Sequence, residues 1–358
     1  MRPRLRDRIE RAAEALWEGR APLASLLLWV PLFLASLVTR VFARRRPARR
    51  KASGCRVVSV GSLHVGGSGK TPVVLELSAR AAALGIPAAV VLRGYGGDVA
   101  GPTRVASDGD PDRFGDEAVL HARRSPRTLV IVSRERRAGV ELARACGARL
   151  VFLDDGFQQR RIAPDRSVVV LPAEAPLGNG RLLPLGPLRE PPSRLSPEDV
   201  LWLHGEPGRR AVGLPIAIRS RLRPAGLVAA GDLAADPAPT PSGPVAAFCA
   251  IARPGRFFGM VEAAGLRLAA RWPLGDHRPI SAAELRAAAA RAAGLGASAL
   301  VCTEKDAARL RVPDDLALPV YALRVSLSIE AGEERVAGLL SDGSVAARAP
   351  NERSRGDR

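Results

Sequence analysis

The chain has 358 residues, of which 47% are hydrophobic and 25% are charged, a composition and length that suggest two folded globular units. Its formal net charge of +18 favours an anionic partner: a nucleic acid, an acidic membrane surface or a phosphorylated ligand. A low aromatic content of 4% and the lack of a nucleic-acid-binding module argue against a specific nucleic-acid partner. The four cysteines are widely spaced, which argues against a zinc site and against a disulfide framework.

An apolar segment, APLASLLLWVPLFLASLVTR, occupies residues 21–40 and carries no charge before its last position. Its length is about that needed to cross a bilayer core, but Pro31 would kink a spanning helix. The preceding residues look like a surface helix, and the basic run RVFARRRPARRK follows. We therefore predict that residues 1–54 form a monotopic membrane anchor and basic linker; a spanning helix, a signal peptide and a buried core helix are the alternatives.

Short β-branched segments and helical segments then alternate over residues 55–205. The pattern predicts strands at 56–60, 88–94, 128–133, 149–155 and 167–172, and helices at 71–84 and 136–146. Continuous apolar strands between helices indicate a parallel sheet covered on both faces, as in P-loop NTPases. In such sheets ligands bind beyond the carboxyl ends of the strands, which is where the polar motifs fall.

Residues 57–85 read as a strand, a glycine-rich loop and a helix, VVSVGSLHVGGSGKTPVVLELSARAAALG. Such a loop turns backbone N–H groups toward phosphate oxygens, and the following helix offers its N-terminus. Lys70 would reach the β- and γ-phosphates, and the Thr71 hydroxyl would hold magnesium. His64 stands where a full Walker A pattern has its first glycine, and a glycine-rich turn without a ligand is the alternative. The predicted ATP-binding residues are Gly66, Gly67, Ser68, Gly69, Lys70 and Thr71.

The segment LVFLDDGFQQ resembles a Walker B strand, in which a carboxylate at the strand end holds Mg²⁺ directly or through water. Asp154 and Asp155 are adjacent like charges, which favours a nearby cation. An apolar strand that happens to end in two aspartates is the alternative. Together with Lys70, this motif predicts Mg–ATP binding.

Other polar candidates follow the remaining strands. Arg93, Arg181 and Arg189 can pair with phosphate oxygens, and Tyr95 can stack on a base or sugar. Asp116 opens a predicted helix, where it is either a functional carboxylate or an N-cap.

A second α/β lobe is predicted over residues 206–345, followed by a polar, disordered tail at 346–358. VAAFC and SALVC read as strands, and each lies beside a helical segment. In this lobe His277, beside Asp276, is either half of an acid–base pair or part of a surface turn. Lys305, one of only three lysines, is expected to pair with Glu304 or Asp306, with a nucleotide contact as the alternative.

Seven motifs occur in one order: VGSLHVGGSGKTP, LRGYGG, GDEAVL, LDDGFQQ, GNGRLLPLGPLREP, DHRPIS and TEKDA. This set, which spans about residues 57–310, resembles the signature of the tetraacyldisaccharide 4′-kinases, the lipid A kinases of Gram-negative bacteria. GNGRLLPLGPLREP is the most specific of the seven. The resemblance implies a P-loop kinase on the cytoplasmic face of the inner membrane, with a second, smaller α/β lobe. It also implies that His64 stands at a position where the first Walker glycine is commonly absent.

The implied reaction is transfer of the γ-phosphate of ATP to the 4′-hydroxyl of tetraacyldisaccharide 1-phosphate, which gives lipid IV(A). An acidic, acylated substrate in an anionic leaflet agrees with the apolar segment, the arginine run and the net charge. No obligate protein partner is inferred. A membrane-associated P-loop kinase or NTPase with another acceptor is the alternative, although no N-K-x-D guanine-specificity motif is present.

The resemblance also implies residue roles. Lys70 would serve ATP, Asp116 would be the general base on the sugar hydroxyl, and His277 would support it from the second lobe. The family's frequent DDGFQH is DDGFQQ here, so Gln159 puts any proton-handling role at that position in doubt. The implied metal site is Thr71, Asp154 and Asp155, and the implied substrate site is Arg93, Tyr95, Asn179, Arg181, Arg189 and Glu190.

Overall fold

The computed structural model describes residues 13, 17, 36, 50–51, 54–159, 161–208, 213–275 and 278–341. The predicted apolar anchor segment (except Ser36), the tail at 346–358 and the candidate His277 therefore lie outside the described residues. Within the described ranges, none of the helices combines the length and apolar character needed to cross a membrane.

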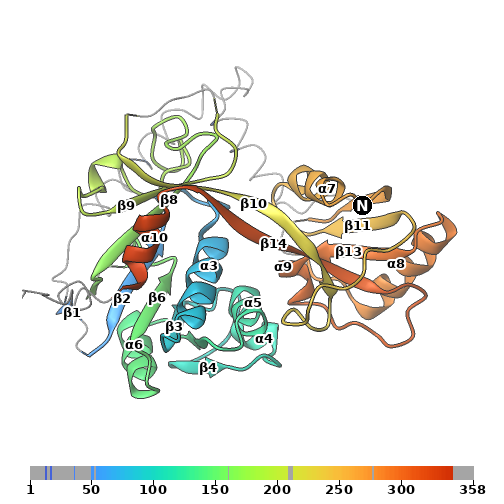
Figure 1. Ribbon diagram of the computed structural model, residues 1–358, viewed down its shortest axis with the longest axis horizontal. Helices are drawn as coiled ribbons and strands as arrows, with labels where there is room; N and C mark the ends of the chain where they lie inside the picture. Colours follow the sequence, from blue (N-terminus) through green and yellow to red (C-terminus); the bar gives the residue numbers. More distant parts are fainter. Residues whose placement is uncertain are drawn as a thin grey trace, which may run out of the picture.

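A mixed 12-stranded sheet runs through the molecule in the order β12-β11-β13-β14-β10-β9-β8-β2-β6-β3-β5-β4 (Figure 1). The half formed by the N-terminal strands, from β9 to β4 in this order, is called the first half. It is parallel except for the edge strand β4, which is antiparallel to β5. The strands of this half are β2 (Arg56–Gly61), β3 (Ala88–Leu92), β4 (Thr103–Val105), β5 (Leu129–Val132), β6 (Leu150–Asp154), β8 (Arg166–Pro172) and β9 (Val200–His204). A separate parallel pair joins β1 (Arg50–Lys51) to β7 (Ile162–Ala163).

Helices cover both faces of this half, as the apolar strands predict. Successive residues of a strand point to opposite faces, so Val57 and Val58 of β2 enter different hydrophobic clusters. The cluster with Val58 contains residues of α3 and α5, and the cluster with Val57 contains residues of α6. The helices are α3 (Lys70–Ala83), α4 (Pro111–Phe114), α5 (Asp116–Arg124) and α6 (Arg136–Ala145), with a 3-10 turn at Pro192–Arg194.

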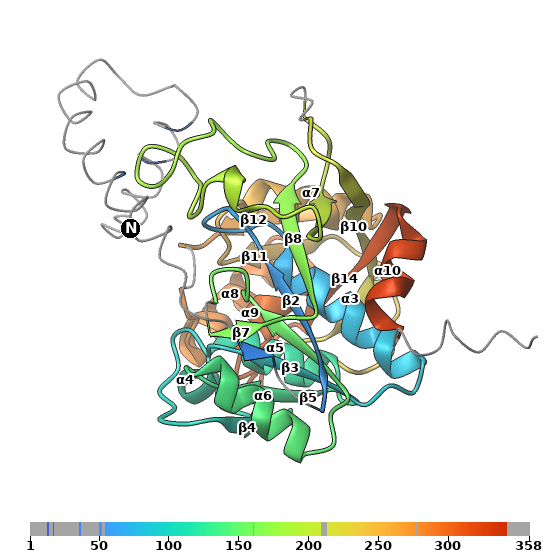
Figure 2. The same cartoon turned by 90° about the vertical axis from the view of Figure 1, so that its left-hand side faces the viewer.

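Two long antiparallel strands, β10 and β14, connect this half to a second lobe (Figures 1 and 2). In that lobe α7 and α8 contribute to different hydrophobic clusters. Val245 and Ala246, successive residues of β11, face opposite sides of the sheet, so Val245 joins the cluster of α7 and Ala246 that of α8. The elements are β10 (Ile216–Ala229), β11 (Val245–Cys249), α7 (Pro254–Ala263), β12 (Leu268–Pro273), α8 (Ala282–Gly294), β13 (Ala299–Thr303), α9 (Glu304–Ala307), β14 (Val320–Ala331) and α10 (Glu333–Leu340).

The strands of residues 55–205 form a parallel sheet, as the sequence predicts, except that β4 is antiparallel to β5. The antiparallel pair of β10 and β14 lies beyond this range, where the sequence predicted only an α/β lobe. β10 has the sequence IAIRSRLRPAGLVA, which lacks a continuous apolar run, and its register shifts between Pro224 and Leu227. Proline and glycine are depleted in strands and concentrate at such irregularities, so this strand left no clear signal.

The last helix, α10, packs against α3 of the first half (Figure 1). Arg80 of α3 forms an ion pair with Glu333, and Nη2 of Arg56 donates to the Gly338 carbonyl at 3.0 Å. The chain thus returns to its first half after completing the second lobe. The division of the chain at residues 205 and 206 stays a prediction.

Candidate active site

The glycine-rich loop lies between β2 and α3, and Lys70 is the first residue of the helix. No side chain caps the N-terminus of α3, so its first N–H groups are available to an anion. A Cβ at Gly66 or Gly67 would meet no atom within 4 Å, which shows that this side of the loop is open. The buried Ser68 Oγ has no hydrogen-bond partner among the described residues. These features suit an oxyanion ligand.

Gly69 ends the loop in a left-handed conformation, with φ of 89°. A Cβ at this position would collide with the ring of His204, the last residue of β9. Nδ1 of that ring lies 3.1 Å from Ser220 Oγ. Burial, helped by the charge of Arg256, lowers the pKa of His204 to about 4, so this ring is neutral near pH 7.

His64 occupies the position of the absent Walker glycine and is buried. Its Nε2 lies 2.7 Å from the Pro176 carbonyl, and its backbone N–H donates to Ser62 Oγ at 3.0 Å. It also forms a β-bridge with Leu188. Burial lowers the pKa of His64 despite the contact with Pro176. His64 therefore ties the start of the loop to the GNGRLLPLGPLREP segment.

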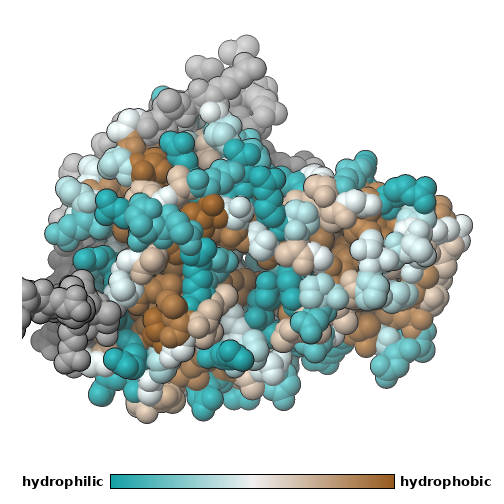
Figure 3. Space-filling model, viewed as in Figure 1, coloured by the Kyte–Doolittle hydropathy of each residue, from teal (hydrophilic) through white to brown (hydrophobic). Residues whose placement is uncertain are grey.

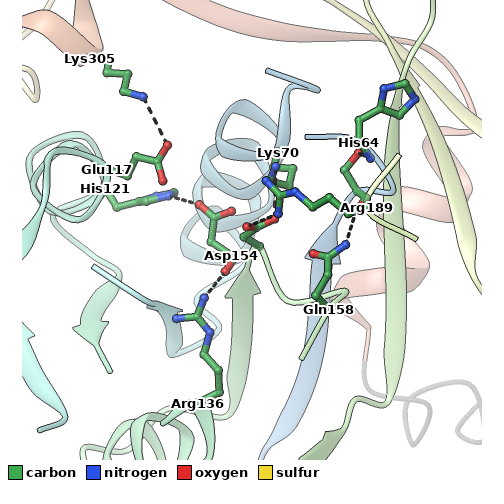
Figure 4. A network of polar contacts seen from close by, with 11 residues as sticks. His64, Lys70, Glu117, His121, Arg136, Asp154, Gln158, Arg189 and Lys305 are labelled. Carbon is green, nitrogen blue, oxygen red and sulfur yellow. Dashed lines mark hydrogen bonds and ion pairs between the residues drawn. The ribbon is translucent and has the colours of Figure 1, made fainter. Parts of the chain in front are cut away.

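Lys70 meets Asp155 at the end of β6, with 3.3 Å between Nζ and Oδ1 (Figure 4). Nη1 of Arg189 lies 2.9 Å from the other carboxylate oxygen, Oδ2. Partial burial opposes ionisation, but these two cations outweigh it and lower the pKa of Asp155. Gln158 Nε2 donates to the Ser62 carbonyl at 2.7 Å, which attaches the LDDGFQQ segment to the loop. The two motifs predicted to form one site do lie together.

Asp154 has different neighbours. It is 3% exposed, and its Oδ2 lies 3.0 Å from Nε2 of His121, a fully buried residue of α5. Nη2 of Arg136 donates to the Asp154 carbonyl at 2.8 Å. Burial lowers the pKa of Arg136 to about 10, although the two aspartates oppose the shift. Sequence reasoning missed both His121 and Arg136. One signal was available, since His121 follows Asp116 in the same predicted helix.

Asp116 is the first residue of α5 and is buried against the second lobe. Its Oδ2 lies 2.8 Å from Nη2 of Arg309 and 3.7 Å from Nζ of Lys305. Lys305 also lies 3.5 Å from Glu117 (Figure 4). The prediction that Lys305 pairs with a sequence neighbour is therefore wrong. Each neighbour has its own partner: Glu304 pairs with Arg124, and Asp306 accepts hydrogen bonds from Thr303 and Ala250.

The face shown in Figure 3 is hydrophilic where the two lobes meet, in keeping with this contact between charged side chains of α5 and the α9 region. At the other end of the same interface, Nη1 of Arg123 donates to the Ala307 carbonyl at 3.4 Å. α5 is therefore held to the second lobe at both ends.

The residues predicted to bind substrate separate into two groups. Arg93, Tyr95 and Arg181 are exposed. Asn179 instead braces its own loop, because Nδ2 donates to the Leu185 carbonyl at 2.9 Å and Oδ1 accepts from the Arg181 N–H. Glu190 is buried and pairs with Arg194 at 2.7 Å.

Gln159 stabilises a turn through two hydrogen bonds to Ile162. Its Oε1 accepts from the Ile162 N–H at 3.0 Å, and its Nε2 donates to the Ile162 carbonyl at 3.2 Å. Both polar ends of the amide are thus used locally. This arrangement gives Gln159 a structural role in the turn that follows the two aspartates.

Comparison with known proteins gives a consistent result. The sequence model of the LpxK family, tetraacyldisaccharide-1-P 4′-kinase, matches residues 23–342. The tetraacyldisaccharide 4′-kinase of Nitrobacter winogradskyi is 40% identical over 85% of this chain and 88% of its own, and that of Rhodospirillum centenum is 41% identical over 84% and 89%. The crystal structure of "apo" form LpxK from Aquifex aeolicus in complex with ATP has a TM-score of 0.66 and 25% identity, covering 88% of this chain and 96% of that one. This chain belongs to the tetraacyldisaccharide-1-P 4′-kinase family.

Proposed function

We propose that this chain transfers the γ-phosphate of ATP to the 4′-hydroxyl of tetraacyldisaccharide 1-phosphate, forming lipid IV(A) in lipid A biosynthesis. The observation that carries the proposal is the meeting of Lys70, from the glycine-rich loop, with the acidic end of β6. The relatives named tetraacyldisaccharide 4′-kinase match this chain over most of its length, which supports the choice of acceptor.

ATP would bind to the P-loop NTPase-like half of the molecule. The open side at Gly66 and Gly67, the uncapped start of α3 and the unpartnered Ser68 Oγ fit phosphate oxygens. The Asp155 side chain is 41% exposed and also contacts Arg189, so Lys70 can exchange this carboxylate for a phosphate at small cost. Arg189 would neutralise Asp155 while Lys70 is engaged with the nucleotide.

The residues at this edge also fit Mg²⁺, which prefers hard oxygen donors and takes part of its shell from phosphates and water. Thr71 supplies a hydroxyl at the start of α3, and Asp154 and Asp155 supply carboxylates at the end of β6. Asp154 is the better candidate of the two, since both oxygens of Asp155 already face cations. The chemistry that Mg²⁺ supplies when bound is neutralisation of charge on the phosphate oxygens.

Asp116 would act as the general base. As the acceptor oxygen bonds to the γ-phosphorus, its proton passes to the Asp116 carboxylate, and the bond from that phosphorus to the bridging oxygen of ADP breaks. Such a transfer depends mainly on positioning and charge neutralisation. Arg309 and Lys305 would hold the Asp116 carboxylate in place. His277, the proposed supporting residue, lies outside the described residues.

The acylated substrate would be taken from the cytoplasmic face of the inner membrane, with residues 1–54 as the anchor. Trp17, a described residue of this segment, donates its Nε1–H to the Pro184 carbonyl of the GNGRLLPLGPLREP loop at 2.9 Å, and this contact supports the proposal that the loop works beside the membrane. The exposed Arg93, Tyr95 and Arg181 would contact the disaccharide and its phosphate, and Asn179 and Glu190 would brace the loops that carry them.

The test is transfer of labelled γ-phosphate from ATP to tetraacyldisaccharide 1-phosphate in detergent micelles, with Lys70→Ala and Asp116→Asn beside the unmodified protein. We expect a loss of about 10²- to 10³-fold for Lys70→Ala and about 10²- to 10⁴-fold for Asp116→Asn. Asp315→Asn is the matched control, because Asp315 also pairs with an arginine but is exposed and contacts Arg286 of α8, in the second lobe.

Each outcome is informative. Product in the unmodified protein and in Asp315→Asn, with loss in both site variants while each remains folded at the assay temperature, supports the proposal. Loss in Lys70→Ala alone moves the general base to another residue. If the unmodified protein binds ATP but forms no lipid product, the proposed acceptor is wrong.

A further inference from the structure

We propose that His121 is a positioning residue for the metal-binding carboxylate: it holds one oxygen of Asp154 so that the other faces the magnesium site. The proposal rests on the function proposed above and adds a residue that no part of that function used. Its test is chosen so that an error in the acceptor would leave it intact.

The geometry of the pair carries the argument. His121 is completely buried in α5, and its Nε2 lies 3.0 Å from Oδ2 of Asp154. An ionised carboxylate only accepts hydrogen bonds, so Nε2 carries the hydrogen and donates it. Hydrogen bonds to a charged acceptor are stronger and more directional than neutral ones, and this one fixes the rotation of the Asp154 side chain.

The two adjacent aspartates differ in what their second oxygen does. Both oxygens of Asp155 face a cation, Lys70 or Arg189. Oδ1 of Asp154 has no hydrogen-bond or ion-pair partner among the residues that the structure describes. One oxygen of Asp154 is thus held by a buried imidazole, and the other remains for a cation. Residues that orient a metal ligand in this way commonly change metal affinity by about 10- to 100-fold.

A purely structural role does not account for the histidine. Its Nδ1 is buried and has no hydrogen-bond partner within the described part of the chain. Burying an unpartnered polar atom costs free energy, whereas an aliphatic side chain would fill the same space without that cost. The neighbouring buried residues of α5, Ala118, Val119 and Leu120, are all apolar. What the imidazole adds at this position is the hydrogen bond to Asp154.

The helix that carries His121 also connects two parts of the proposed mechanism. Asp116, the proposed general base, begins α5, and His121 lies five residues later, which corresponds to a rise of about 7.5 Å. The same helix therefore carries the group that would receive the proton and the group that orients the metal carboxylate. His121 anchors α5 to the end of β6 at this point.

The experiment compares His121→Leu, which removes the donor, with His121→Gln, whose side-chain N–H can still donate to Asp154. Binding of a fluorescent ATP analogue is titrated with Mg²⁺ and repeated in EDTA, without any lipid. We expect His121→Leu to need about 10- to 100-fold more Mg²⁺ for half-maximal effect, with unchanged affinity in EDTA. His121→Gln should recover most of the Mg²⁺ sensitivity.

Ser78→Ala is the matched control. Ser78 is also a buried helical residue with an unpartnered side-chain oxygen, but it belongs to α3 and has no carboxylate partner among the described residues. It should titrate like the unmodified protein. A shift as large in Ser78→Ala as in His121→Leu would attribute the effect to general loosening of the core and would overturn the proposal.

Two further results would also overturn it: an unchanged Mg²⁺ requirement in folded His121→Leu, or a requirement in His121→Gln that differs from that of the unmodified protein as much as the leucine variant does. If His121→Leu does not fold, the glutamine variant decides alone. An error in the proposed acceptor would leave this titration unaffected, because no acceptor is present. Failure of the unmodified protein to bind the nucleotide would reject both proposals.

Discussion

The two charged regions of this molecule are built in opposite ways. At the glycine-rich loop, Lys70 and Asp155 belong to two motifs of the same lobe, and their ion pair is accessible, since the Asp155 side chain is 41% exposed. At the contact between α5 and the α9 region, Asp116 and Arg309 are 193 residues apart in the chain, and the Asp116 side chain is 9% exposed. The first region is therefore a site that can exchange partners, and the second is a fixed joint.

Solvent exposure explains this difference. An exposed ion pair is screened by water and salt and contributes little to stability, so a phosphate can replace one partner. Removing one partner from a buried pair instead leaves an uncompensated charge. A single chain thus places the same kind of pair at the proposed nucleotide site in one region and between its two lobes in another.

The largest predicted effect is a loss of stability when Arg309 is removed from the contact between α5 and the second lobe. Arg309→Ala leaves Asp116 with Lys305 at 3.7 Å as its remaining identified cation, and we expect a loss of about 3 kcal/mol in the free energy of unfolding. Lys70→Ala should cost less, about 1 kcal/mol, because Asp155 keeps Arg189 at 2.9 Å and its side chain is 41% exposed. Urea unfolding of both variants in the same micelles gives the comparison.

A double-mutant cycle completes this test. Adding Asp116→Asn to Arg309→Ala removes the carboxylate that has lost its closest cation, so the double variant should be more stable than the sum of the single effects implies. Additive losses would show that the two side chains do not stabilise each other, and equal losses for Arg309→Ala and Lys70→Ala would remove the distinction between joint and exchange site.

The next predicted effect concerns the conformation of Gly69 in the glycine-rich loop. In Gly69→Ala a Cβ meets the His204 ring at a φ of 89°, and we expect a loss of about 1–3 kcal/mol in stability together with weaker ATP binding. Gly101→Ala, outside the loop, is the matched control, because Gly101 is exposed and a Cβ there meets nothing within 4 Å. Calorimetric unfolding and nucleotide titration of the two variants measure the difference. Equal behaviour would mean that the loop tolerates a change of conformation at Gly69.

The last prediction concerns the dependence of stability on pH. The pKa of His204 is lowered to about 4 in the folded protein, whereas an unfolded histidine titrates near about 6.5. The unfolded chain therefore binds the extra proton first, and stability falls as the pH drops from about 6.5 toward 4. Between pH 7 and 5 we expect His204 to account for about 2 kcal/mol of this loss. His204→Asn, which keeps a side-chain partner for Ser220, should lose less stability over the same interval; an identical pH dependence would contradict the prediction.

Much of the first half of the fold was predictable because its signals are local. The strands at 56–60, 88–94 and 149–155 were predicted to within two residues at each end, since buried parallel strands are short continuous apolar runs. The glycine-rich loop was found in its predicted context between a strand and a helix. β10 was not predicted, because its sequence lacks a continuous apolar run and its register shifts between Pro224 and Leu227. β14 was missed although Leu323, Val325, Leu327 and Ile329 alternate with polar residues, the pattern of a half-buried strand.

The sequence by itself determined the α/β elements of the first half, the loop with Lys70, and the acidic end of β6, because each depends on residues close together in the chain. Only the tertiary structure decided that Lys305 faces Asp116 and Glu117, and that His121 lies against Asp154. A charge in a sequence specifies what kind of partner it needs, but which partner it meets depends on which elements the sheet makes neighbours. Here α5 is the element that the fold sets between the end of β6 and the second lobe, and both of those pairs depend on it.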